Sequence, residues 1–256
     1  MMNLPVGIQS FLKETGEISR FSWRFFKEGF SPRFELSEFI RQCFVLGYKS
    51  LPLVGLTAFI IGLVLTMQLR PTMEYYGVEV QIPAMVGVAI FREIGPILTA
   101  LIFAGKIGSS IGAELGSMKV TEQIDAMEVS GTNPFKYLVV TRTLATTLML
   151  PILTIIADAI ALIGAYLGEN IYDTLPFNLF FRKVFLNLAY IDLIPAFIKT
   201  FFFGFAVGII GCYKGYFTDK GTEGVGKAAN SSVVVSSVMI FLIDLVAVQI
   251  ADLFQR

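Results

Sequence analysis

Long apolar runs separated by short polar segments dominate the chain. No ionisable side chain lies between Ser50 and Leu69, and about twenty apolar residues in a helix cross the hydrocarbon core of a bilayer. Runs of this kind predict five membrane-spanning helices, at Tyr48–Leu69, Pro83–Gly105, Lys136–Leu167, Leu193–Tyr213 and Ala229–Leu253. The third run is too long for an untilted span, so part of it is expected to tilt or protrude. The predicted fold is an all-α integral membrane protein.

The segment before the first span has a different pattern. Between Ile18 and Phe44, aromatic residues alternate with lysines and arginines. This suits an amphipathic helix in the headgroup layer, with its rings at the acyl boundary and its cations toward phosphate. Pro32 predicts a break within it; a soluble cap on the bundle is the alternative. We therefore divide the chain into interfacial helices, residues 1–47, and a transmembrane domain, residues 48–256.

Lysine and arginine are unevenly distributed between the two sides of the predicted bundle. Fourteen precede the first span or belong to the second and fourth connections, and four fall on the other side. Connections rich in these residues stay in the cytoplasm. The N-terminus and the second connection are therefore predicted to be cytoplasmic, and the C-terminus to lie outside.

The second connection is the longest polar stretch, GKIGSSIGAELGSMKVTEQIDAMEVSGTNPFKYLVVTR, from Gly105 to Arg142. Its glycines predict that the second helix ends near Gly105. A short helix follows, for which Ser117 or Thr121 is the expected N-cap and Gly131 the expected stop, with Pro134 beyond it.

This short helix is predicted to be amphipathic. Its apolar stripe consists of Val120, Ile124, Met127 and Gly131, and its acidic face consists of Glu122, Asp125 and Glu128. The helix could lie passively against lipid, but anionic lipid would disfavour three clustered acids. The pattern therefore favours a protein partner at this face.

Two charged residues, Arg92 and Glu93, fall within the second span just before Gly95 and Pro96. Proline bends a helix and frees carbonyl groups, and charged side chains at that depth face a cavity or one another. Adjacent residues on a helix do not face each other. Arg92 and Glu93 are therefore candidates for a transport path or for separate structural pairs. Lys199 in the fourth span and Asp158 in the third are further candidates, either of which could instead snorkel or pair.

Small residues recur at every fourth position in two places, as Ala104, Gly108, Gly112 and Gly116 and as Thr200, Gly204, Gly208 and Cys212. Small residues at this spacing let helices approach closely in lipid. They indicate packing within the chain or, as the alternative, a self-association face.

Composition narrows the candidate chemistry. Of all residues 55% are hydrophobic and 16% charged, histidine is absent, and the two cysteines have no metal-binding spacing. The net charge of +0 gives no indication of nucleic acid. Residues Gly221–Ala228, GTEGVGKA, approach a phosphate-binding loop but end in alanine where the motif needs serine or threonine. No catalytic residue, metal or cofactor is predicted here, and any ATP must be bound by another subunit.

Two segments carry a family resemblance. FREIGPILTALIFAGKIGSSIGAELGSMKVTEQIDAMEVSGTNPFKYLVVTR and GTEGVGKAANSSVVVS resemble the MlaE (YrbE) permeases of bacterial ABC-type lipid transporters. The likeness runs from about Leu51 to Phe254. It implies a permease subunit in the bacterial inner membrane that moves phospholipid between the inner and outer membranes and maintains the lipid asymmetry of the outer membrane.

The resemblance also implies partners. The permease would be a homodimer with a cytoplasmic ABC ATPase on each subunit, which binds ATP and magnesium, and with a periplasmic MCE-domain protein. Some members also recruit a small STAS-domain protein. The short helix would be the coupling helix seated in the ATPase; its expected contact residues are Lys119, Glu122, Gln123, Asp125, Ala126 and Glu128. The alternatives are a secondary transporter or a membrane-bound lipid enzyme that acts without an ATPase.

Overall fold

The computed structural model describes residues 6–29, 35–219 and 221–255, which form helices and connections and contain no strand. Five helical runs among them are long and apolar enough to cross a membrane: Leu36–Tyr75, Glu79–Val120, Phe135–Asn170, Tyr190–Tyr216 and Thr222–Leu253. Each run contains one of the predicted spans. The all-α fold with five spans is therefore confirmed.

Several runs combine α-helix with short π-helical or 3-10 turns. The first contains α2 (Leu36–Gln42), η1 (Cys43–Gly47), η2 (Tyr48–Ser50) and α3 (Leu51–Tyr75). The second contains η3 (Glu79–Gln81), α4 (Ile82–Ala89), η4 (Ile90–Ile94), α5 (Gly95–Phe103), η5 (Ala104–Gly108) and α6 (Ser109–Val120). The third contains η6 (Phe135–Val140) and α8 (Thr141–Asn170). The last two are α10 (Tyr190–Tyr216) and α11 (Thr222–Gln255). Outside the five runs lie α1 (Val6–Gly29), α7 (Gln123–Val129) and α9 (Phe177–Asn187).

The runs are longer than a bilayer requires. The second has 42 residues, which extend over about 60 Å at 1.5 Å per residue, twice the hydrocarbon thickness of about 30 Å. The predicted helix end near Gly105 is therefore wrong: the backbone passes through the π-helical turn Ala104–Gly108 and continues as α6 to Val120. The helix persists because α6 packs against α10 and α11.

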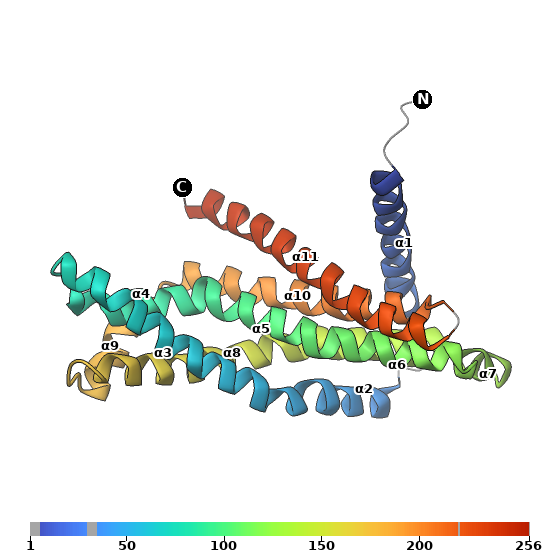
Figure 1. Ribbon diagram of the computed structural model, residues 1–256, viewed down its shortest axis with the longest axis horizontal. Coiled ribbons are helices and arrows are strands. Elements are labelled where there is room, and N and C mark those ends of the chain that lie inside the picture. The colour runs from blue at the N-terminus through green and yellow to red at the C-terminus, as the bar shows by residue number, and fades with distance from the viewer. Residues whose placement is uncertain (1–5, 30–34, 220, 256) are drawn as a thin grey trace.

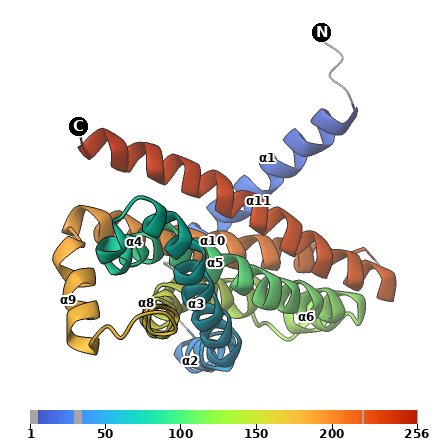
Figure 2. The same cartoon turned by 60° about the vertical axis from the view of Figure 1, so that its left-hand side comes forward.

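The five runs lie side by side along the long axis of the molecule (Figure 1). In chain order, α3 packs against α8, α8 against α10, and α10 against both α6 and α11. The short helix α7 lies at one end, beyond α6, and α9 lies at the opposite end beside α4 (Figures 1 and 2). The C-terminal half of α11 diverges from the other helices (Figure 1).

The two stripes of small residues serve packing within the chain. A Cβ added at Gly112 would lie 2.5 Å from Oγ of Ser232 in α11, and one at Gly208 would overlap Thr146 in α8. Larger residues would push these helices apart. Of the two readings of the stripes, packing within the chain is the one that the contacts support.

The core has two parts, one near each end of the bundle. The part near α7 is built from α6, η6, α8 and α10, and includes Phe21 and Phe25 of α1. The other part is built from α3, α4, α8 and α9, and includes Phe180 and Val184 of α9. The sequence does not predict α9, because its 11 residues are too few for a span and contain Arg182 and Lys183.

Helix α1 stands across the long axis of the bundle (Figure 1). Its Phe21 ring packs on Phe135 and Tyr213, with centroids 4.9 and 5.6 Å away, whereas Trp23 is 75% exposed. This is the orientation that a helix in the headgroup layer adopts beside membrane spans. Pro32 lies outside the described residues, between α1 and α2. The helical run that starts at Leu36 continues across position 47, the predicted boundary between the interfacial helices and the transmembrane domain.

Candidate functional site

The first candidate region is α7 and the turn before it. Glu122, between α6 and α7, has a φ of 59°, a left-handed conformation that reverses the chain tightly. The hydroxyl of Thr121 donates to the Ser117 carbonyl at 2.8 Å, inside α6. No side chain caps α7, so the predicted N-cap at Ser117 or Thr121 is wrong. The Thr121 hydroxyl is already bonded within the preceding helix α6 and is not available to cap α7.

The C-terminal end of α7 agrees with the predicted stop. Gly131 has a φ of 81°, and its amide donates to the Glu128 carbonyl at 3.1 Å. The Thr132 amide donates to the Met127 carbonyl, also at 3.1 Å. A left-handed glycine with this pair of bonds satisfies the last carbonyl groups of a helix.

The two faces of α7 differ as the sequence pattern predicts. Ile124 is 1% exposed and Met127 packs against the core. The exposed residues of this segment include Glu122, Gln123, Asp125, Ala126 and Glu128. Lys119 joins them through an ion pair of 2.8 Å between its Nζ and Oδ1 of Asp125. The residues expected to contact an ATPase thus form one polar surface at the end of the molecule.

Helix α1 supports the loop that follows α7. Nδ2 of Asn133 donates to Oε2 of Glu28 at 2.9 Å, and Glu28 pairs with Arg24 at 2.6 Å. The Arg24 guanidinium lies 4.2 Å from the centroid of the Phe135 ring. Helix α1 and the polar surface of α7 are thereby connected.

The second candidate region is a cluster of charges inside the bundle. Lys199 of α10 is 3% exposed and binds two carboxylates: its Nζ lies 2.6 Å from Oε2 of Glu93 in η4 and 2.8 Å from Oδ1 of Asp244 in α11. Three helical runs meet at this ammonium group. Charge-assisted bonds of this length are strong in a medium of low polarity.

Arg92 faces a separate partner. Its guanidinium NH1 lies 3.5 Å from Oδ1 of Asp192 at the start of α10, and 37% of its side chain is exposed. Arg92 and Glu93 therefore do not pair with each other, as their adjacency requires. With Asp192 and Lys199 they line a cavity of about 20 Å³, which is too small for a lipid head group.

A π-helical turn places these two side chains. Residues Ile90–Ile94 form η4, and Gly95 and Pro96 start α5 directly after it. Pro96 has no amide hydrogen, so a regular α-helical bond is missing here. A π turn inserts one extra residue and recurs at functional sites. It shifts the direction of Arg92 and Glu93 relative to the rest of the span.

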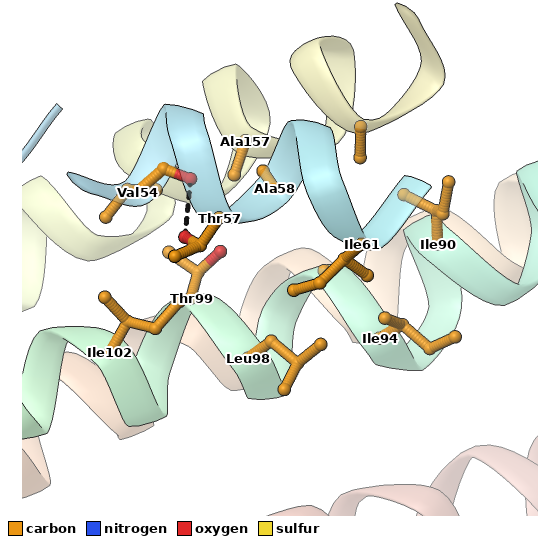
Figure 3. Close-up of a pocket in the computed structure, with 12 residues that line it drawn as sticks. Val54, Thr57, Ala58, Ile61, Ile90, Ile94, Leu98, Thr99, Ile102 and Ala157 are labelled. Atoms are coloured by element: carbon orange, nitrogen blue, oxygen red, sulfur yellow. Dashed lines mark hydrogen bonds between the residues drawn. The ribbon is translucent and has the colours of Figure 1, made fainter. Parts of the chain in front are cut away.

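An apolar seam lies beside the same turn. Figure 3 shows Thr57, Ala58 and Ile61 of α3 opposite side chains of η4 and α5, with Ala157 of α8 behind. The Thr57 hydroxyl donates to the Val54 carbonyl at 2.9 Å, so it is satisfied within its own helix. The accessible volume is about 10 Å³. The seam is closed in this conformation.

The sequence does not single out the partners of these charges. Asp192 directly precedes the fourth predicted span and Asp244 is a lone acid within the fifth. Only their proximity to Arg92 and Lys199 gives them a role. The sequence also did not predict a third cluster of charges. In this cluster Arg70 of α3 pairs with Asp173 at 2.6 Å and with Glu74 at 2.6 Å. Among the described residues, no group of three or more histidine, cysteine or acidic side chains could hold a metal ion.

Known proteins resemble this chain over most of its length. A family model described as Permease MlaE matches residues 39–250. A probable ABC transporter permease protein of Rickettsia prowazekii (strain Madrid E) is 41% identical over 234 residues, which cover 91% of this chain and 90% of the relative. One from Pyropia yezoensis is 34% identical over 244 residues, covering 95% and 92%. One from Synechocystis sp. is 35% identical over 204 residues, covering 79% and 77%.

Proposed function

Because the chain belongs to the MlaE permease family and is the permease subunit of an ABC transporter, we propose that it moves phospholipid between the inner and outer membranes of a bacterium and so maintains outer-membrane lipid asymmetry. An ABC permease implies an ATPase partner and is not itself an ATPase. ATP and magnesium therefore belong to that partner. The observation that carries the lipid proposal is the set of charges held within the spans by η4 and α10.

Arg92 is the proposed contact for the phosphate group. Its only ion-pair partner among the described residues is Asp192, at the long distance of 3.5 Å, and the side chain is partly exposed. A guanidinium binds phosphate through two parallel bonds, which an ammonium cannot reproduce. Lys199, by contrast, is buried between two acids. Its proposed role is to hold Glu93 and Asp244 beside the lipid path.

The polar surface of α7 is the proposed contact with the ATPase. Glu122, Asp125 and Glu128 are exposed together at the end of the bundle, and the buried Ile124 fixes α7 against the core. A rigidly held acidic helix can transmit movement of a basic groove to the spans. We therefore assign α7 the role of coupling helix.

Helix α11 supports the proposed homodimer. Only 11% of the most apolar stretch of α11 is buried, and Val234, Val238 and Phe241 are among its exposed side chains. The same helix carries Asp244, which binds Lys199. A second copy packed on α11 would bring two charge clusters to one central space, larger than the closed cavities within a single chain.

The remaining partners follow from the family. A periplasmic MCE-domain protein would sit at the α9 end, and a small STAS-domain protein would act through the ATPase. The proposed location is the bacterial inner membrane, with the N-terminus and α7 in the cytoplasm and the C-terminus in the periplasm. The unequal distribution of lysine and arginine supports this orientation.

A transport assay tests the proposal. The permease is reconstituted with its ATPase and MCE partners, and labelled phospholipid transfer to acceptor vesicles is followed with and without ATP. Arg92→Ala should lower the ATP-dependent rate at least about tenfold, because one charge-assisted hydrogen bond contributes about 1.5–3 kcal/mol. Arg92→Lys should lower it less. Arg20→Ala, which changes an exposed arginine of α1, is the control.

Two outcomes would contradict the proposal. One is a folded, dimeric Arg92→Ala protein that transfers lipid like the wild type, which would remove Arg92 from the path. The other is transfer by the permease without ATPase or ATP, which would instead indicate a secondary transporter or a lipid enzyme.

A further inference from the structure

Among the described residues, the carboxyl group of Asp158 forms no ion pair, and its Oδ1 accepts no hydrogen bond. Three acidic side chains are buried among the described residues: Glu38, Asp158 and Glu169. Glu38 pairs with Arg41 at 2.6 Å and Glu169 with Arg70 at 3.6 Å. Asp158 is 4% exposed, and its Oδ1 accepts no hydrogen bond from any described residue. It differs from the other two because no cation among the described residues pairs with it.

Asp158 lines a cavity of about 230 Å³ between α8, α10 and the helix formed by η4 and α5. The cavity walls are otherwise apolar except for Thr154, whose hydroxyl donates to the Leu150 carbonyl at 3.0 Å. The walls include the rings of Phe91 and Phe197. Of the described residues that line this space, Asp158 is the only charged one.

The cations nearest in the fold are already paired. Asp158 packs directly against Gly95, where an added Cβ would overlap its Oδ1, so it lies at the level of the charge cluster that begins at Arg92. Arg92 pairs with Asp192, and Lys199 binds two acids of its own. An ionised carboxylate without a partner is costly at membrane depth. The charged form of Asp158 would therefore be stabilised by a cation from outside the described residues.

We propose that this cavity binds the ammonium group of a lipid head group, with Asp158 as the counter-ion. The carboxylate accepts the N–H groups of a primary ammonium, and aromatic rings such as Phe91 and Phe197 attract a cation at their faces. The apolar walls suit the methylene groups beside the nitrogen. The inference rests on the proposed lipid transport and narrows it to amine-bearing phospholipids.

The position of the cavity agrees with a zwitterionic head group. Ala196 lines both this cavity and the smaller one that contains Arg92. The ammonium of a head group in the larger cavity would meet Asp158, and its phosphate would meet the exposed part of the Arg92 side chain. Asp158 is the residue that would distinguish a head group with an amine from one without.

The test measures which lipid the purified, full-length permease retains. The protein is incubated with equal amounts of phosphatidylethanolamine and its N-acetyl derivative, which have the same phosphate and acyl chains but differ in the charge of the nitrogen. Retained lipids are quantified by mass spectrometry. The wild type should retain the amine-bearing lipid at least about fivefold more, the ratio that corresponds to about 1 kcal/mol.

Asp158→Asn keeps the shape of the side chain and removes its charge, so it should retain both lipids equally. Glu169→Gln makes the same change at another buried acid of α8 and should keep the wild-type ratio. A second measurement needs only the wild type: dodecylammonium should displace retained phosphatidylethanolamine, whereas uncharged dodecanol at the same concentration should not.

Equal retention of the two lipids by the wild type, an unchanged ratio in Asp158→Asn, or equal displacement by dodecylammonium and dodecanol would overturn the ammonium site while leaving lipid transport intact. Retention of no phospholipid by the wild type would overturn the proposed function itself.

Discussion

Single side chains show how this chain places charge in an apolar setting. Lys199 is buried and shared by Glu93 and Asp244, whose side chains are 33% and 14% exposed. Two acids bound to one ammonium leave a net negative charge, which Arg92 and Asp192 nearby do not change. The cluster connects η4, α10 and α11, so it fixes the relative position of three spans in addition to any role in transport.

Replacing Lys199 should therefore destabilise the protein. In Lys199→Met the two carboxylates lose their cation, and removing one partner of a buried pair costs about 3–5 kcal/mol; the partial exposure of Glu93 places the expected loss at the lower end. Thermal unfolding in detergent measures it. Lys49→Met, at an exposed position, should unfold like the wild type. An equal transition temperature in Lys199→Met would show that the cluster does not stabilise the bundle.

Helical elements depart from regular geometry at the places where function is proposed. The turn η4 carries Arg92 and Glu93, η5 replaces the expected helix end near Gly105, and Glu122 adopts a left-handed conformation before α7. The turns η4 and η5 change the direction of side chains without ending the helical run, whereas Glu122 lies between the end of α6 and the start of α7. A left-handed residue with a side chain costs about 1–2 kcal/mol, which the packing of Ile124 and Met127 offsets.

Charge reversal on α7 should uncouple the permease from its ATPase. Glu122→Lys and Asp125→Lys place a cation where the proposed partner groove is basic, and like charges brought together cost several kcal/mol, roughly a hundredfold or more in affinity. Co-purification of the ATPase and permease-stimulated ATP hydrolysis measure the effect.

Glu223→Lys reverses an exposed acid at the start of α11, on the same side of the bundle, and should leave both readouts unchanged. Normal ATPase binding and normal lipid transport by both α7 variants would show that α7 is not the coupling helix.

The whole molecule is an elongated bundle with distinct ends. One end carries α7, α1 and the start of α11, and the other carries α9 and the end of α3 (Figures 1 and 2). At the α7 end, α6 extends the second run past the predicted span. We propose that the membrane surrounds the α9 half and that the α7 end lies in the cytoplasm.

Cysteine labelling tests this orientation. In a background that lacks Cys43 and Cys212, single cysteines at Glu223 and Phe177, both exposed, should react with impermeant reagents from opposite sides of the membrane. The expected cytoplasmic position is Glu223, because it belongs to the lysine-rich side. Labelling of both positions from one side would exclude the five-span topology with separated ends.

Much of the architecture follows from local pattern. The sequence predicts the five apolar runs, the short amphipathic helix that ends at Gly131 and the aromatic N-terminal helix. It does so because burial in lipid depends on hydrophobicity summed over neighbouring residues. Helix ends were less predictable: α6 remains helical beyond Gly105 because α10 and α11 cover it. The short helix α9 was not predicted for a similar reason, because it is stabilised by contacts of Phe180 and Val184 with α4.

Which charged side chains pair with each other is decided by the tertiary structure. Arg92, Glu93 and Lys199 stand out in the sequence as charges at membrane depth, since their cost there is independent of their neighbours. Which acid each cation meets depends on helix rotation, and a single π turn changes that rotation. Asp192 joins Arg92, Asp244 joins Lys199 and Asp158 meets no cation only because α8, α10 and α11 approach the second run at fixed depths. Those approaches are set by side-chain packing between distant segments, such as those of Glu93 and Lys199, 106 positions apart, which no local pattern encodes.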